Sequence, residues 1–107
     1  MSFGLKEETI KKINTIFAEY PQVEEAILYG SRAKGSYKPG SDIDLTLRGN
    51  GLNLRVLNKI TLALDDLLLP YIIDLSIYYR IENQDLLEHI ERVGRIFYTK
   101  KEVEVVG

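Results

Sequence analysis

The feature that most constrains the fold of this 107-residue chain is an alternation of short apolar runs with amphipathic helical segments. Between residues 7 and 20, apolar side chains recur every three or four positions, which predicts a helix that ends before Pro21. Residues 26–29 are continuously apolar, as in a strand that is buried on both faces and central in its sheet. This alternation predicts an α/β (α+β) fold.

The rest of the chain continues the same pattern. We expect helices over residues 53–69 and 83–93, and further strands over residues 42–47, 71–78 and 96–98. Asn53 and Asn83 are suited to cap the two helices, and Pro70 ends the first of them. The prediction is a single domain over residues 1–107, with a small mixed β-sheet of three to four strands, helices packed on one face and a flexible tail over residues 99–107.

Composition excludes several classes of function. The chain has no cysteine, which excludes disulfides, thiolate zinc sites and cysteine nucleophiles. Its net charge of -2 does not favour bulk attraction to nucleic acid or to an anionic membrane. The longest nearly apolar stretch, residues 67–73, is far shorter than the roughly 20 residues of a membrane helix, and the chain begins without a hydrophobic leader. We therefore expect a cytoplasmic protein.

Three aspartates suggest a site. Asp42 and Asp44 are two residues apart on a predicted strand, so their side chains leave one face about 6 to 7 Å apart. Two such charges repel each other by about 2 to 3 kcal/mol at an effective dielectric near 20. Asp74 interrupts the apolar strand over residues 71–78. If the two strands are neighbours, all three carboxylates converge as a ligand set for Mg²⁺. Alternatively, they belong to a turn or an exposed strand face.

A glycine and a serine follow the predicted central strand. Gly30 and Ser31 could direct a backbone N–H and a hydroxyl at a phosphate, because the start of a helix offers unpaired donors. Between residues 30 and 41 the only charged residues are basic: Arg32, Lys34 and Lys38. The plainer alternative is an ordinary turn with solvated lysines. The glycine-serine turn, the aspartate pair and Asp74 together indicate a phosphate and metal site more strongly than any one of them alone.

These residues carry a family resemblance. Residues 30–36, with the sequence GSRAKGS, and residues 41–45, with the sequence SDIDL, closely resemble the motif of the DNA polymerase beta-like nucleotidyltransferase superfamily. The short chain is most similar to the minimal nucleotidyltransferase (MNT) proteins, which are often encoded as antitoxins beside HEPN-domain ribonuclease toxins. The resemblance implies a nucleotidyltransferase fold.

The resemblance also implies a role for each motif residue. Two Mg²⁺ ions would be held by Asp42, Asp44 and Asp74, and the nucleotide would be bound by Gly30, Ser31, Arg32 and Lys34. It further implies transfer of AMP from ATP to a tyrosine hydroxyl of a HEPN toxin. The chain has no room for a second substrate domain, so the toxin or a second copy in a homodimer would complete the pocket. Two alternatives stay open: a binding module that neutralises the toxin by complex formation, and a transferase acting on small molecules.

Other residues give weaker signals. His89 is the only histidine and is expected at a surface or boundary position rather than in a metal site. Tyr37 lies between the two halves of the motif and could stack on a base, although aromatic residues are common in loops. Leu62, Leu68 and Leu69 widen an apolar helix face, which fits either an interface or a thick core.

Overall fold

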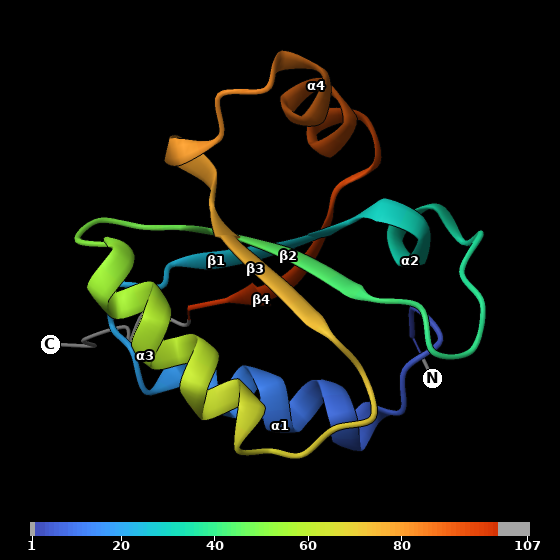
Figure 1. The fold of residues 1–107 in the computed structure, drawn as a ribbon, viewed down its shortest axis with the longest axis horizontal. Coiled ribbons are helices and arrows are strands. Elements are labelled where there is room, and N and C mark those ends of the chain that lie inside the picture. The colour runs from blue at the N-terminus through green and yellow to red at the C-terminus, as the bar shows by residue number, and fades with distance from the viewer. Residues whose placement is uncertain (1, 101–107) are drawn as a thin grey trace, which may run out of the picture.

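A computed structural model describes residues 2–100, in which a four-stranded sheet is flanked by helices (Figure 1). The elements in chain order are α1 (Glu7–Ala18), β1 (Glu25–Tyr29), α2 (Gly30–Lys34), β2 (Ile43–Arg48), α3 (Leu54–Asp65), β3 (Ile73–Ile77), the 3₁₀ helix η1 (Tyr78–Arg80), α4 (Gln84–Val93) and β4 (Arg95–Thr99). The predicted α/β fold with a small mixed sheet is confirmed. Of the predicted tail, Thr99 closes β4 and residues 101–107 lie outside the described residues.

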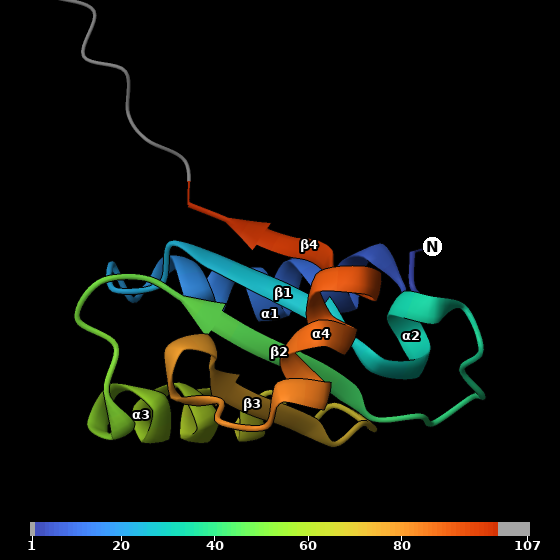
Figure 2. The same ribbon diagram turned by 90° about the horizontal axis from the view of Figure 1, so that it is seen from above.

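The sheet has the strand order β3-β2-β1-β4, and β1 is central as its apolar sequence predicted. β1 runs antiparallel to both of its neighbours, whereas β2 and β3 run parallel. Parallel neighbours need a crossover connection, and α3 provides it between β2 and β3 (Figure 2). None of the helices between residues 2 and 100 is long and apolar enough to cross a membrane.

The main core lies between one face of the sheet and the helices α1 and α3. The alternation in β2 places Ile43, Leu45 and Leu47 on this face, where all three are fully buried. They pack among Ile13 and Phe17 of α1 and Ile60 and Leu64 of α3. The apolar faces that the sequence predicted therefore meet in one cluster, and the polar face of β2 is left on the opposite side of the sheet.

A second, smaller cluster covers that opposite side. Ile27 and Tyr29 of β1 pack there against Ile90 of α4. The prediction of helices on one face holds for α1 and α3 and is wrong for α4, which lies on the other side of the sheet (Figure 1). The reason is that β1 is apolar at consecutive positions, so its second face also needs a cover.

The predicted helix caps are confirmed. The Asn53 side chain accepts a hydrogen bond from the Val56 N–H at 3.0 Å, and Asn83 accepts one from the Leu86 N–H at 3.1 Å. However, α3 ends at Asp65 and not at the predicted residue 69. Leu68 has a positive φ of 54°, so the chain leaves the helix before it reaches Pro70.

Leu62, Leu68 and Leu69, for which an interface and a thick core were the two interpretations, differ in burial. Leu62 and Leu68 are exposed, at 65% and 88% of their surface, whereas Leu69 is partly buried and packs against the main core. Only Leu69 therefore contributes to the core.

Candidate functional site

The parallel register of β2 and β3 brings two of the predicted acids side by side. Asp44 is the direct partner of Asp74, and on the other side of β2 it is the partner of Tyr29. Residues paired in this way share a face, so Tyr29, Asp44 and Asp74 form a row across three strands. Asp42 precedes β2 by one residue and is exposed, as is Asp74, whereas Asp44 is half-buried. The strands that carry Asp44 and Asp74 are therefore neighbours, which was the condition for the carboxylates to converge.

The charges in this row repel one another. Burial raises the pKa of the Asp44 carboxyl, and the negative charges of Asp74 and Asp42 raise it further, while His89 acts in the opposite direction. Burial also raises the pKa of Tyr29, again with contributions from Asp74 and Asp44. No ion pair within residues 2–100 involves any of the three acids. A cation near Asp44 would therefore relieve an unfavourable interaction.

The donor set fits a hard divalent cation. No cluster of three or more His, Cys, Asp or Glu side chains among residues 2–100 is already arranged to hold a metal ion. Mg²⁺ does not need such a cluster, because it is usually bound through one or two carboxylates together with water and substrate phosphates. The adjacent carboxylates of Asp44 and Asp74, with Asp42 nearby in sequence, supply oxygen ligands of this kind. The chemistry of these residues is thus compatible with Mg²⁺ that arrives with a phosphate ligand.

Gly30 lies against the Asp44 side chain, at the point where β1 passes into α2. Its φ of 74° is in the left-handed region, and a Cβ at this position would collide with Oδ2 of Asp44. Only glycine can therefore adopt this backbone conformation while the Asp44 carboxylate approaches so closely. Ser31 follows in the first turn of α2 and is half-buried. The structure thus brings the predicted phosphate-binding turn and the predicted metal ligand Asp44 together.

His89 is a residue of this site that the sequence analysis missed. It occupies the predicted boundary position, and its Nε2 accepts a hydrogen bond from the Gly30 N–H at 3.1 Å. Its ring also lies edge-on to Tyr29, with 6.2 Å between the ring centroids. The two partners of this hydrogen bond are 59 residues apart in the chain, and only the packing of α4 over β1 brings them together.

The two basic residues predicted to bind the nucleotide have different environments. Lys34 is exposed at the end of α2, where it can meet an anionic ligand. Arg32 is only 2% exposed, and its guanidinium donates hydrogen bonds to the carbonyl oxygens of Phe3 and Ser41. Arg32 therefore points into the fold, which differs from the expectation that it offsets the charge of a triphosphate. Tyr37, the candidate for base stacking, lies over this guanidinium.

The fold is similar to that of solved toxin–antitoxin structures. One is a toxin–antitoxin complex with AMP-PNP, with a TM-score of 0.67 and 20% identity over 91% of this chain and 76% of that one. Another is the toxin–antitoxin MntA-HepT, with a TM-score of 0.66 and 16% identity over 89% of this chain and 74% of that one. At this level of identity the likeness shows a common fold.

Comparison with protein families is more specific. No significant match was found among curated proteins. The family described as Polymerase beta, Nucleotidyltransferase matches residues 11–103, which include the glycine-serine turn and all three aspartates. The chain therefore belongs to the polymerase beta nucleotidyltransferase family.

Proposed function

We propose that this chain is an antitoxin of the minimal nucleotidyltransferase type, which transfers AMP from ATP to a tyrosine hydroxyl of a HEPN-domain toxin. The observation that carries the proposal is the pairing of Asp44 with Asp74 directly beside Gly30. Membership of the nucleotidyltransferase family supports the class of reaction. The likeness to toxin–antitoxin complexes, one of them with AMP-PNP, supports the choice of nucleotide and of partner.

In this proposal, each site residue has one task. Asp42, Asp44 and Asp74 hold two Mg²⁺ ions, while the Gly30 N–H and the Ser31 hydroxyl donate hydrogen bonds to the phosphates of ATP. Mg²⁺ held by these carboxylates would supply Lewis-acid stabilisation of the negative charge that develops during in-line displacement at the α-phosphate. Lys34 offsets part of the triphosphate charge from its exposed position.

The acceptor enters from the exposed side of the acid row. Its tyrosine oxygen forms a bond to the α-phosphorus, the bond to pyrophosphate breaks, and the phenolic proton passes to a carboxylate of the acid row and from there to water. Asp74 is exposed, and we assign it to the acceptor hydroxyl, as the family resemblance implies. Because Asp42 and Asp74 are both exposed, the toxin or a second copy of this chain has to cover them to exclude water. Since the reaction consumes ATP, we place it in the cytoplasm.

The test is a labelling experiment with purified proteins. The chain is mixed with its candidate toxin, Mg²⁺ and ATP labelled at the α-phosphate, and label on the toxin is measured. We expect wild-type protein to label the toxin and the Asp42→Asn, Asp44→Asn double variant to lose this activity. Equal labelling by both proteins would refute the catalytic assignment. A toxin tyrosine replaced by phenylalanine is the matched control for the acceptor.

A second candidate function is neutralisation of the toxin by binding alone. It is favoured by the fact that the Gly30 N–H, a proposed phosphate donor, is already bonded to His89. Cells that express the toxin distinguish the two functions. A transferase protects them only when the acids are intact, whereas a binding module protects them equally well as the double variant.

A further inference from the structure

Arg32 occupies an unusual position for a basic residue of a phosphate-binding motif. Its Nη1 donates a hydrogen bond to the Phe3 carbonyl oxygen at 2.9 Å. Its Nε and Nη2 both donate to the Ser41 carbonyl oxygen, at 3.1 and 2.9 Å. The rings of Tyr37 and Tyr71 lie 5.3 and 5.0 Å from its guanidinium carbon. The charged group is thus enclosed by backbone oxygens and aromatic faces.

Two of the partners of Arg32 lie just before the strands that carry the acids. Ser41 immediately precedes Asp42, and Tyr71 precedes Asp74 by three residues. The same two segments are joined by a hydrogen bond from the Ile43 N–H to the Ile72 carbonyl oxygen at 2.9 Å. One guanidinium therefore contacts the segments that lead into both β2 and β3.

The energetics argue that this contact does more than stabilise the fold. Burying a cation is costly unless it is paired, and no ion pair within residues 2–100 involves Arg32. Carbonyl oxygens and aromatic rings compensate the charge only in part. An apolar side chain would avoid the cost of burying a charge, but it would leave the Ser41 and Phe3 carbonyl oxygens without a donor. Lysine could not reproduce the contact either, because it lacks the rigid planar fork of arginine.

We propose that Arg32 is a positioning residue for the acid row. By holding the Ser41 carbonyl and the Tyr71 ring, it keeps the starts of β2 and β3 in register and so sets the spacing of the three carboxylates against their mutual repulsion. The proposal deepens the function proposed above and rests on it for the role of the acids. In this proposal, the arginine of the motif positions the acids and does not bind the phosphates directly.

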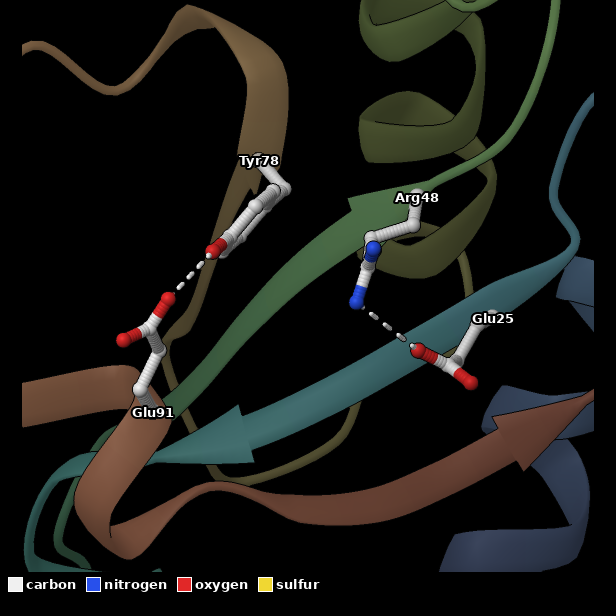
Figure 3. A network of polar contacts seen from close by, with 4 residues as sticks. All are labelled: Glu25, Arg48, Tyr78 and Glu91. Atoms are coloured by element: carbon white, nitrogen blue, oxygen red, sulfur yellow. Dashed lines mark hydrogen bonds and ion pairs between the residues drawn. The ribbon is translucent and has the colours of Figure 1, made fainter. Parts of the chain in front are cut away.

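The chain contains a matched control at the other end of β2. The Arg48 guanidinium carbon lies 4.9 Å from the Tyr78 ring centroid and 6.0 Å from that of Tyr79. Arg48 also forms an ion pair with Glu25 at 3.8 Å (Figure 3). Like Arg32 it contacts two tyrosine rings, but it is the last residue of β2, is half-exposed and is remote from the three aspartates.

The first experiment measures binding of Mn²⁺ alone to the purified full chain by electron paramagnetic resonance. We expect Arg32→Lys to weaken binding by about tenfold or more, as is typical when a residue that orients metal ligands is changed. Arg48→Lys should stay within about twofold of wild type, because an exposed arginine contributes little. Asp44→Asn serves as the reference for loss of the site. Wild-type affinity in Arg32→Lys, with weak binding in Asp44→Asn, would overturn the proposal.

A second measurement does not depend on metal. Amide hydrogen exchange at Ile43 reports the bond that joins the starts of β2 and β3. Arg32→Lys should accelerate this exchange by about tenfold relative to Arg48→Lys, and equal rates would overturn the proposal. If Asp44→Asn leaves Mn²⁺ binding unchanged, the proposed metal site fails by itself. The exchange rates then still decide whether Arg32 positions the strands.

A third variant serves if Arg32→Lys does not fold. Tyr37 is 38% exposed, so Tyr37→Leu removes one aromatic face from Arg32 at little risk to the fold. We expect about threefold weaker Mn²⁺ binding and faster Ile43 exchange, in proportion to the loss of one cation–π contact. A folded Tyr37→Leu protein with wild-type values for both measurements would contradict the proposal.

Discussion

The two ends of β2 use similar residues for different purposes. At the acid end, Arg32 contacts two tyrosine rings and donates its hydrogen bonds within residues 2–100 to backbone carbonyl oxygens. At the other end, Arg48 is also stacked on two tyrosines, but its carboxylate partner is a partly exposed glutamate (Figure 3). Because Arg32 is buried, its contacts hold neighbouring backbone segments in place. The ion pair of Arg48 is weakened because solvent screens the two charges.

The interactions between charged side chains also differ at the two ends: they are repulsive at one and attractive at the other. At the acid end, like charges face each other across β2 and β3, and the pKa of Asp44 is raised. At the other end, Glu25 and Arg48 are directly paired across β1 and β2, so opposite charges attract. The proposed cation site therefore carries unfavourable repulsion when no cation is bound, whereas the Glu25–Arg48 ion pair does not. The following predictions test this contrast.

The largest difference is expected from removing each arginine. Arg32→Met leaves the Ser41 and Phe3 carbonyl oxygens without their partner, and it should lower the free energy of unfolding by about 2 to 4 kcal/mol. Arg48→Met should lower it by less than about 1 kcal/mol, because its ion pair is partly exposed. Urea denaturation measures both values. Equal losses would mean that burial does not distinguish the two arginines.

A smaller loss is expected at the turn beside the acids. Gly30→Ala places a methyl group against the Asp44 carboxylate at a positive φ, and should destabilise the chain by about 2 kcal/mol. Gly40 also has a positive φ, but a Cβ there meets no atom within 4 Å. Gly40→Ala therefore isolates the backbone cost, which should be about 1 kcal/mol. If both variants unfold at the same urea concentration, the close approach to Asp44 carries no cost.

The hydrogen bond at the same turn should have an effect of about 1 kcal/mol. His89→Leu removes the acceptor of the Gly30 N–H and should lower the melting temperature by roughly 4 to 8 °C. Because a phosphate would then find this donor free, AMP-PNP with Mg²⁺ should raise the melting temperature of the variant more than that of wild type. An equal rise in both proteins would indicate that the phosphate does not use the Gly30 N–H.

The smallest predicted effect is a gain in stability. The folded state raises the pKa of Asp44 above its unfolded value, so the protonated carboxyl is the form that folding favours. The contribution of this carboxyl to folding stability is therefore fully present below its unfolded pKa of about 4, and it is lost as the pH rises through the raised folded pKa. In metal-free buffer at neutral pH, Asp44→Asn should melt about 2 to 4 °C higher than wild type.

The pH dependence provides the control for this gain. The advantage of Asp44→Asn should disappear below about pH 4, where the wild-type carboxyl is protonated as well. Glu25→Gln is the matched variant at the other end of the sheet, and it should melt slightly lower than wild type at neutral pH because it loses an attraction. A clear decrease for Asp44→Asn would mean that this acid makes a structural hydrogen bond.

Much of the fold could be predicted from local patterns. Continuous apolar character predicted that β1 would be central, alternation predicted the buried face of β2, and two asparagines predicted their helix starts. These features depend on neighbouring residues in the chain. The end of α3 was misplaced because the apolar pattern continues after the backbone has already turned at Leu68.

Most residues of the candidate site could be predicted from the sequence, but their positions relative to one another in space could not. Gly30, Asp42 and Asp44 lie close together in the sequence, and their spacing indicated phosphate and metal chemistry. Arg32 stands in the same motif, and from sequence alone it is indistinguishable from a phosphate-binding arginine. The residues that enclose it come from the N-terminal segment and from the approach to β3, so its burial could not be read from local sequence.

The amino-acid sequence by itself indicated candidate residues for the chemistry, the approximate ranges of most helices and strands, and the faces that are apolar, because these properties arise from side chains a few positions apart. Only the tertiary structure decided that Asp74 stands beside Asp44, that His89 reaches Gly30, and that Arg32 turns inward. The physical reason is that these contacts join segments distant in the chain. Their formation depends on how the whole sheet and its helices pack, and no local preference encodes it.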